Sequence, residues 1–191
     1  KHGICHRDIK PDNVLLVLSP SEASGMIAKL TDFGLAKAKD SVGGSSTNGS
    51  VGTYSYMSPE LLEILFGKED STSEEEEEGE DGGTKGTKGL DRLKADIYAF
   101  AVLSYEAVTR ERPFLELKPA KINKRVVKQQ QRPGDIPDAA PDGIKEVIKA
   151  AWAQEPRHRP HASQIYSVMM RVRDSLLEAE GKQRSVAAEE R

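Results

Sequence analysis

The stretch CHRDIKPDNVLL, residues 5–16, places three chemically capable side chains, Asp8, Lys10 and Asn13, directly before a run of apolar residues. A carboxylate can accept a proton, an ammonium can neutralise negative charge, and an amide oxygen can bind a hard cation. A polar loop joined to a buried strand suits a catalytic role. Taken alone, Asp8 and Asn13 have a simpler interpretation as turn residues that bond backbone groups.

A second polar motif favours the catalytic interpretation over the interpretation as turn residues. D-F-G stands at residues 32–34, after a second apolar run, while H-R-D at residues 6–8 and Asn13 complete the pattern H-R-D-x-x-x-x-N. Both motifs in this order resemble the protein kinase family, and specifically the C-terminal half of its catalytic domain. The resemblance extends over about residues 1–177.

The resemblance implies transfer of the ATP γ-phosphate with Mg²⁺ as the metal ion. Asp8 would accept the proton of the substrate hydroxyl, and Lys10 would neutralise charge on the transferring phosphate. Asn13 and Asp32 would supply oxygen ligands to the magnesium ion. In the same family the residue at Leu15 lies beneath the adenine ring, although an ordinary core position is the other interpretation.

GTYSYMSPE, residues 52–60, resembles the substrate-binding loop and A-P-E motif of the family, with Ser in place of the usual Ala. We expect the Thr53 hydroxyl to serve the active site. Glu60 should meet Arg159 in a buried ion pair, and Asp96 should hold the backbone of the catalytic loop. His6 and Phe33 are interpreted as packing residues. The helix after Asp96 departs from the usual D-x-W-S-x-G at three positions, Tyr98, Ala99 and Ala101.

Lys10 together with Thr53 favours Ser/Thr over Tyr as the acceptor. The chain then resembles a Ser/Thr kinase, of the general or the tyrosine-kinase-like type, with a protein as its substrate. Two alternatives remain: a non-catalytic kinase-like binding module, and a small-molecule phosphotransferase. The small-molecule phosphotransferase is disfavoured by the long Ser/Thr-rich segment before S-P-E and by the matching Arg159. The non-catalytic module is disfavoured because Asp8 and Asp32 are intact.

The segment from residue 35 to 52 resembles an activation loop. Phosphate placed there by an upstream kinase or by the protein itself would be bound by Arg7 and Lys37, which could otherwise be solvated surface charges. The candidate acceptors are Ser45, Ser46, Thr47 and Ser50.

Length and composition limit the number of domains, the kinds of partner and the location that can be expected. A chain of 191 residues suits one domain, and its net charge of −3 offers no broad basic field for nucleic acid. The single cysteine, Cys5, excludes an internal disulfide and favours a reducing, intracellular location, with the cytoplasm first. No apolar run is long enough to span a membrane.

Hydrophobic patterning predicts an α+β domain that is mainly α-helical with a small β-hairpin, corresponding to the C-terminal lobe of the kinase fold. Residues 67–89, rich in Glu, Gly, Lys, Ser and Thr, are expected to be a disordered acidic insert, solvated or else an interaction segment. Residues 178–191 are expected to be a charged tail. The hairpin strands are predicted at residues 13–18 and 25–31, and the helices at 59–66, 95–109, 141–154 and 162–179.

The chain begins at Lys1, close to its catalytic motif, and contains no G-x-G-x-x-G phosphate loop. We therefore expect that the N-terminal lobe is absent from this sequence. Since the nucleotide lies between two lobes in this family, we also expect these 191 residues to bind ATP poorly and to be inactive by themselves.

Overall fold

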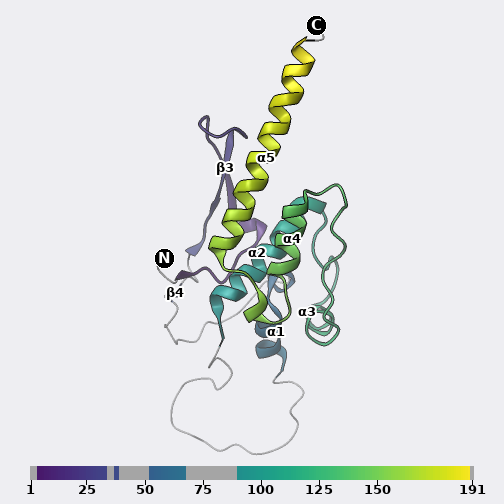
Figure 1. The fold of residues 1–191 in the computed structure, drawn as a ribbon. Coiled ribbons are helices and arrows are strands. Elements are labelled where there is room, and N and C mark those ends of the chain that lie inside the picture. The colour runs from purple at the N-terminus through teal and green to yellow at the C-terminus, as the bar shows by residue number, and fades with distance from the viewer. Residues whose placement is uncertain (1–3, 34–36, 39–51, 68–89, 190–191) are drawn as a thin grey trace, which may run out of the picture.

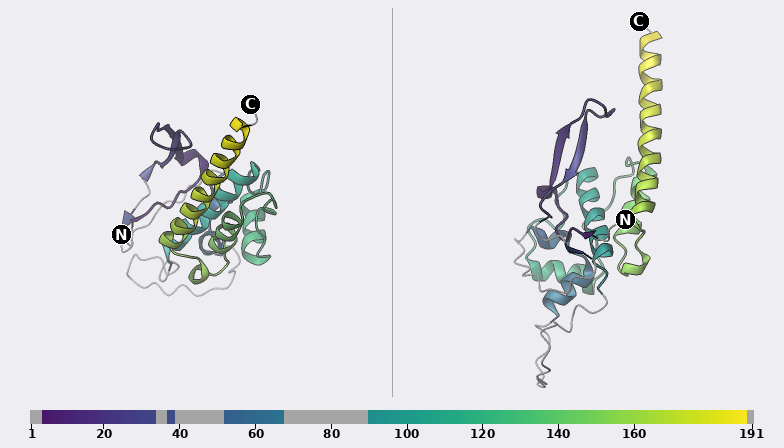
Figure 2. Two further views of the ribbon diagram at one scale, coloured as in Figure 1. Left: turned by 45° about the horizontal axis from the view of Figure 1, so that its top comes forward. Right: turned by 90° about the vertical axis from the view of Figure 1, so that its left-hand side faces the viewer.

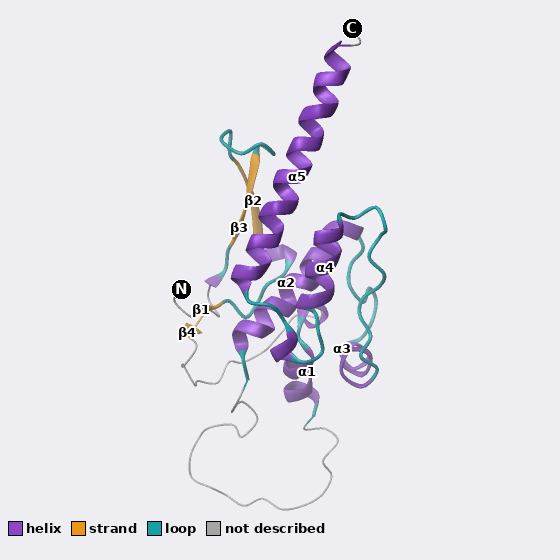
Figure 3. Cartoon of the chain, viewed as in Figure 1, coloured by secondary structure: helices purple, strands orange, loops and turns teal. Residues whose placement is uncertain are grey.

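The computed structural model describes residues 4–33, 37–38, 52–67 and 90–189 (Figure 1). The expected acidic insert, apart from its first residue, lies outside these ranges. So do the four candidate phosphorylation sites. The predicted α+β class is confirmed, because the described chain is rich in helices and carries only short antiparallel strand pairs (Figure 3).

The predicted hairpin is confirmed. Strand β2 (Val14–Leu18) pairs antiparallel with β3 (Met26–Leu30), and Val14 lies opposite Leu30 at its base. Gly25 adopts a φ of 71°, a left-handed conformation that glycine reaches at little cost, at the end of the turn. A second pair, β1 (Ile4–Cys5) with β4 (Lys37–Ala38), was not predicted, since strands of two residues leave no periodic signal.

The helices form the body of the fold, and the hairpin and the C-terminal part of the last helix project from it in the same direction (Figure 2). Along the chain they are α1 (Pro59–Phe66), α2 (Arg92–Thr109), α3 (Pro119–Asn123), the π-helical turn η4 (Lys124–Lys128), α4 (Asp142–Ala151) and α5 (Ala162–Glu189), with short 3₁₀ turns η1 (Pro11–Asn13), η3 (Thr53–Tyr56) and η5 (Pro156–His158). None of the helices in the described ranges combines the length and apolarity needed to cross a bilayer.

Helix α2 is the centre of the core. Asp91 caps its first turn by accepting bonds from the backbone N–H groups of Leu93 and Lys94, at 3.1 and 3.3 Å. This cap explains why the helix begins three residues before the predicted start. The buried side chains of α2, among them Tyr98 and Val102, lie on one side of the helix. The other side is only half-buried and Ala107 is exposed, so the apolar residues spread around this helix do not give burial on all sides.

Helix α5 is longer than expected. It continues through Gly181 to Glu189, where the sequence analysis placed a tail. Residues 173–183 are exposed, so no buried apolar stripe holds this part of the helix in place. Residues 178–189 are mostly Ala, Glu, Lys, Gln and Arg, which have high intrinsic helix propensity, and this accounts for the extension. The domain boundary near residue 177 stays a prediction.

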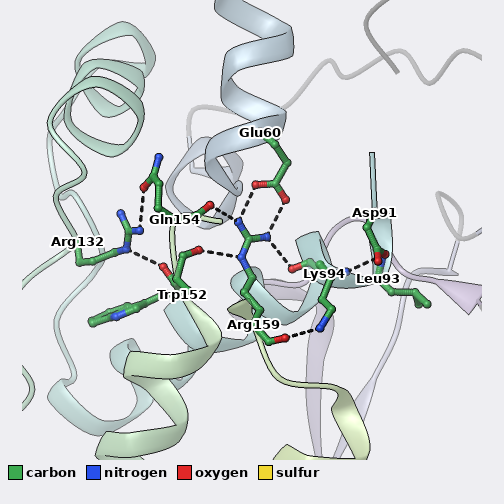
Figure 4. Close-up of polar contacts among 9 residues, drawn as sticks. Glu60, Asp91, Leu93, Lys94, Arg132, Trp152, Gln154 and Arg159 are labelled. Atoms are coloured by element: carbon green, nitrogen blue, oxygen red, sulfur yellow. Dashed lines mark hydrogen bonds and ion pairs between the residues drawn. The ribbon is translucent and has the colours of Figure 1, made fainter. Parts of the chain in front are cut away.

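The predicted ion pair between Glu60 and Arg159 is confirmed and is part of a larger network (Figure 4). The two terminal nitrogens of Arg159 each lie 2.7 Å from one carboxylate oxygen of Glu60. Carbonyl oxygens of Lys94, Gln154 and Ala153 accept the three remaining N–H groups at 2.9, 3.1 and 2.9 Å. All five donors of this buried guanidinium are therefore satisfied.

Tyr98, one of the three departures from the usual helix pattern, supports the same network. Its buried ring lies 5.1 Å from the guanidinium carbon of Arg159 and 5.5 Å from that of Arg132. The π system of the ring therefore attracts both cations. Its hydroxyl has no partner in the described structure, and burial raises the pKa of Tyr98 to about 12.

Replacing Arg159 tests how much this hydrogen-bond network contributes to the stability of the fold. In Arg159→Leu the carboxylate of Glu60 loses its partner and three carbonyl groups lose their donors. The free energy of unfolding should fall by about 3–5 kcal/mol, the usual cost of breaking a buried pair. Urea denaturation of the native protein measures it, with Arg173→Leu as control because Arg173 pairs with Asp174 on the surface. Equal effects of the two substitutions would contradict the assignment.

Candidate active site

Asp96, on α2, fixes the backbone of the loop that carries Asp8. One carboxylate oxygen accepts the N–H of His6 at 2.6 Å, and the other accepts the N–H of Arg7 at 2.8 Å. This confirms the predicted contact between Asp96 and the loop. Burial raises the pKa of the Asp96 carboxyl, while the two backbone donors act in the opposite direction.

His6 connects this loop to the D-F-G motif. Its Nε2 lies 2.8 Å from the carbonyl oxygen of Thr31, and its Nδ1 lies 3.3 Å from the N–H of Asp8. The two contacts together require a neutral ring with the proton on Nε2. The ring also meets Phe33 edge-on, with centroids 4.8 Å apart. These contacts agree with the packing role expected for His6 and Phe33.

Four of the predicted site residues meet at one point. The Lys10 ammonium lies 2.8 Å from a carboxylate oxygen of Asp8 and 3.1 Å from the Thr53 hydroxyl. The Asn13 amide nitrogen donates to the same Asp8 oxygen at 3.0 Å and to the Asp8 carbonyl at 2.7 Å. Turn η3, in the expected substrate loop, is thereby joined to the loop of Asp8.

Asp32 follows directly on residues that pair with Asn13. The N–H and hydroxyl of Thr31 both donate to the Asn13 carbonyl oxygen, at 2.8 and 3.2 Å. Asp32 itself is exposed and adopts a φ of 58°, as Arg7 does with 73°. Left-handed backbone at a residue other than glycine costs on the order of 1 kcal/mol or more and is concentrated at functional sites.

The residues present fit a hard cation at Asn13 and Asp32. The Asn13 amide nitrogen is held by Asp8, which fixes the orientation of the amide group. Its Oδ1 accepts no hydrogen bond from the described residues. An oriented amide oxygen and a carboxylate are hard oxygen donors of the kind that Mg²⁺ prefers when phosphate and water supply the remaining ligands.

The side chain of Leu15 is 53% exposed on the hairpin. Among the described residues Leu15 is therefore not in the hydrophobic core, so its interpretation as an ordinary core residue does not hold for this part of the chain. Contact with an adenine ring stays a prediction.

The guanidinium of Arg7 is buried, and none of its three nitrogens has a hydrogen-bond partner in the described part of the chain. Burial lowers the pKa of Arg7, and the charge of nearby Arg92 acts in the same direction. The proximity of Arg92 was not predicted, because Arg92 precedes the helix expected at residues 95–109 and belongs to none of the motifs. The side chain of Lys37 lies outside what the structure describes.

A second contact that sequence reasoning missed joins Tyr56 of η3 to α2. The Tyr56 hydroxyl bonds to the Glu106 carboxylate. Burial, followed by this bond, raises the pKa of Tyr56. Tyr56 lies within the expected substrate loop, but nothing there indicates a partner for its hydroxyl. Glu106, a charged residue on a helix with a buried side, was a possible signal for a polar partner.

Comparison with known proteins agrees with this geometry. The sequence model of the protein kinase domain matches residues 1–169, and the chain belongs to the protein kinase family.

Its curated relatives include several named serine/threonine-protein kinases. The light-sensor protein kinase of Ceratodon purpureus is 36% identical over 83% of this chain and 12% of its own length. The probable serine/threonine-protein kinase gdt4 of Dictyostelium discoideum is 34% identical over 84% of this chain and 8% of its own length. Receptor-interacting serine/threonine-protein kinase 3 of Homo sapiens is 28% identical over 82% of this chain and 26% of its own length. The chain thus spans a minor part of each of these relatives.

The raised pKa of Asp96 predicts the direction in which the stability of the protein changes with pH. A carboxyl whose pKa is higher in the folded than in the unfolded state holds its proton more tightly when folded, so its contribution to stability falls as pH rises from about 4 upward. Asn at this position does not titrate. The stability of the parent relative to Asp96→Asn should therefore be greatest at acidic pH and decline towards neutrality. Urea unfolding of both proteins between pH 3.5 and 7.5 measures it, and a difference that grows with pH would contradict the shift.

Proposed function

We propose that the protein is a serine/threonine kinase that transfers the γ-phosphate of ATP to hydroxyl groups of protein substrates. The observation that carries this proposal is the contact chain from Asp8 through Lys10 to Thr53. A base, a cation and the expected substrate loop lie within hydrogen-bond distance of one another.

Each residue has a role in this proposal. Asp8 accepts the proton of the attacking hydroxyl, and Lys10 stabilises negative charge on the transferring phosphate. Thr53 positions Lys10 and borders the acceptor, where its short hydroxyl suits a Ser or Thr side chain. The bond from Asn13 to Asp8 holds the carboxylate in one orientation, so the base is pre-positioned.

Mg²⁺ bound by Asn13 and Asp32 would supply charge neutralisation for the phosphates. Leu15 presents an exposed apolar surface for the adenine ring. We assign the 191 residues to the C-terminal lobe of the kinase domain, with residues 1–177 as the domain portion. The phosphate-binding glycine loop would come from other parts of the native protein. An intracellular location fits both the ATP requirement and the single cysteine.

Two substitutions separate the roles of the acidic residues in the native protein. Asp8→Asn should abolish phosphoryl transfer and leave Mg-ATP binding nearly unchanged, because this carboxylate acts on the acceptor. Asp32→Asn should instead weaken Mg-ATP binding at least tenfold, since it removes a charged metal ligand. Calorimetry with Mg-ATP and a peptide phosphorylation assay measure both. Substantial turnover by Asp8→Asn would falsify the assignment of the base, and unchanged nucleotide affinity in Asp32→Asn would refute the metal site.

We also propose that phosphorylation of the activation loop, by an upstream kinase or by the protein itself, regulates activity. The support is the Arg7 guanidinium, whose buried nitrogens have no partner in the described residues. A buried cation without an acceptor is costly, and a phosphate oxygen satisfies it with a charge-assisted bond.

Removing the acceptors tests this regulation. The variant Ser45→Ala, Ser46→Ala, Thr47→Ala, Ser50→Ala should lose most activity, on the order of tenfold or more, because no phosphate reaches Arg7. Kinase assays before and after phosphatase treatment measure the effect, with Ser163→Ala on α5 as a distant control. If phosphatase leaves the parent protein fully active, the loop is not the switch.

A further inference from the structure

One surface carries a charge that the proposed chemistry does not use. Between Glu116 and Asp135 the chain contains basic residues and no acidic one, although its overall charge is −3. The basic residues are Lys118, Lys121, Lys124, Arg125, Lys128 and Arg132. The first five lie in or beside α3 and η4, and we call them the basic face.

Packing fixes the direction in which these charges point. Ile122 and Val126, four residues apart, are each 1% exposed and anchor the segment in the core. The charged residues between and around them are exposed. Since the two apolar side chains hold the segment against the body of the fold, the basic side chains must face solvent.

The side-chain charges of four of these residues are not used within the described fold. The side chains of Lys118, Lys121, Lys124 and Arg125 make no ion pair with any described residue. Lys121 stands three and four residues from Lys124 and Arg125, the spacings at which like charges on a helix repel. An ordinary solvated helix face mixes both signs of charge. The absence of acidic residues points to a binding function.

The basic face adjoins the proposed acceptor site. Helix α3 packs against η3, whose first residue, Thr53, lies 3.1 Å from the Lys10 ammonium. Arg112 is also near enough to η3 to influence Tyr56 electrostatically. A protein substrate whose hydroxyl reaches Asp8 would therefore pass close to α3, which lies on the far side of the body from the hairpin (Figure 1).

We propose that the basic face docks an acidic segment of the protein substrate, outside the residues that enter the active site. The inference rests on the proposed kinase function. A peptide fits better than nucleic acid or a membrane because those polyanions extend well beyond one face and would meet the net negative charge of the rest of the chain. A short acidic segment meets only the basic face.

The test uses the native protein and two peptides. Each carries one Ser acceptor joined by a Gly/Ala linker to a tail of six Glu or six Gln residues. The docking variant is Lys121→Glu, Lys124→Glu, Arg125→Glu. The control variant is Lys149→Glu, Arg157→Glu, Arg171→Glu, which makes the same charge change at exposed positions elsewhere. Anisotropy of a fluorescent Glu-tail peptide without Ser measures binding independently of turnover.

The parent and the control variant should show a KM for the Glu-tail peptide about tenfold below that for the Gln-tail peptide, as expected from a few exposed ion pairs. The docking variant should lose this difference while its kcat and its KM for the Gln-tail peptide stay unchanged. The difference should also shrink at 0.5 M salt, because screening shortens the range of exposed charges.

Equal KM values for the two peptides in the parent, or equal behaviour of the docking and control variants, would overturn the docking proposal and leave the kinase function standing. Binding of the Glu-tail peptide that depends on the basic face, without phosphorylation of any peptide, would support docking and reject the kinase function. Binding of oligouridine or phosphatidylserine vesicles, but not of the Glu-tail peptide, through the basic face would overturn the proposal.

Discussion

The guanidinium of Arg159 is the contact on which the arrangement of the helices depends. It joins the start of α1 through Glu60, the start of α2 through the Lys94 carbonyl, and the connection from α4 to α5 through two further carbonyls. A buried cation costs the fold least when every donor is satisfied, as it is at Arg159. These segments must therefore take one relative position, and in it both α2 and η3 contact the loop that carries Asp8.

The helices held by Arg159 position the candidate site through a few further contacts. Helix α2 presents Asp96, which holds the backbone of His6 and Arg7. His6 then reaches the carbonyl before the D-F-G motif, and Asn13 orients Asp8. The side chains of the candidate site are thus positioned indirectly, because other side chains bond to the backbone of their loop, which has little regular structure of its own.

Sequence alone predicted the hairpin, four of the helices, the Glu60–Arg159 pair and the residues that meet at Asp8. These follow from periodicity and from motifs whose chemistry constrains residue type. The strands β1 and β4 and helix α3 were missed, because elements of two to five residues carry too little pattern. The C-terminal extension of α5 was missed because local propensity, without an apolar stripe, determines it. The contact between Tyr56 and Glu106 and the proximity of Arg92 to Arg7 depend on tertiary structure that no local signal records.

The anchoring of the catalytic loop by Asp96 also has a consequence for the order in which the protein is made. His6 and Arg7 precede their carboxylate partner by 90 and 89 residues. At a synthesis rate of about 5–20 residues per second, the loop leaves the ribosome roughly 5–20 s before Asp96 does. During that interval its N–H groups can bond only to water. The loop that carries Asp8 is therefore synthesised well before Asp96 and can take its final backbone contacts only after Asp96 has followed.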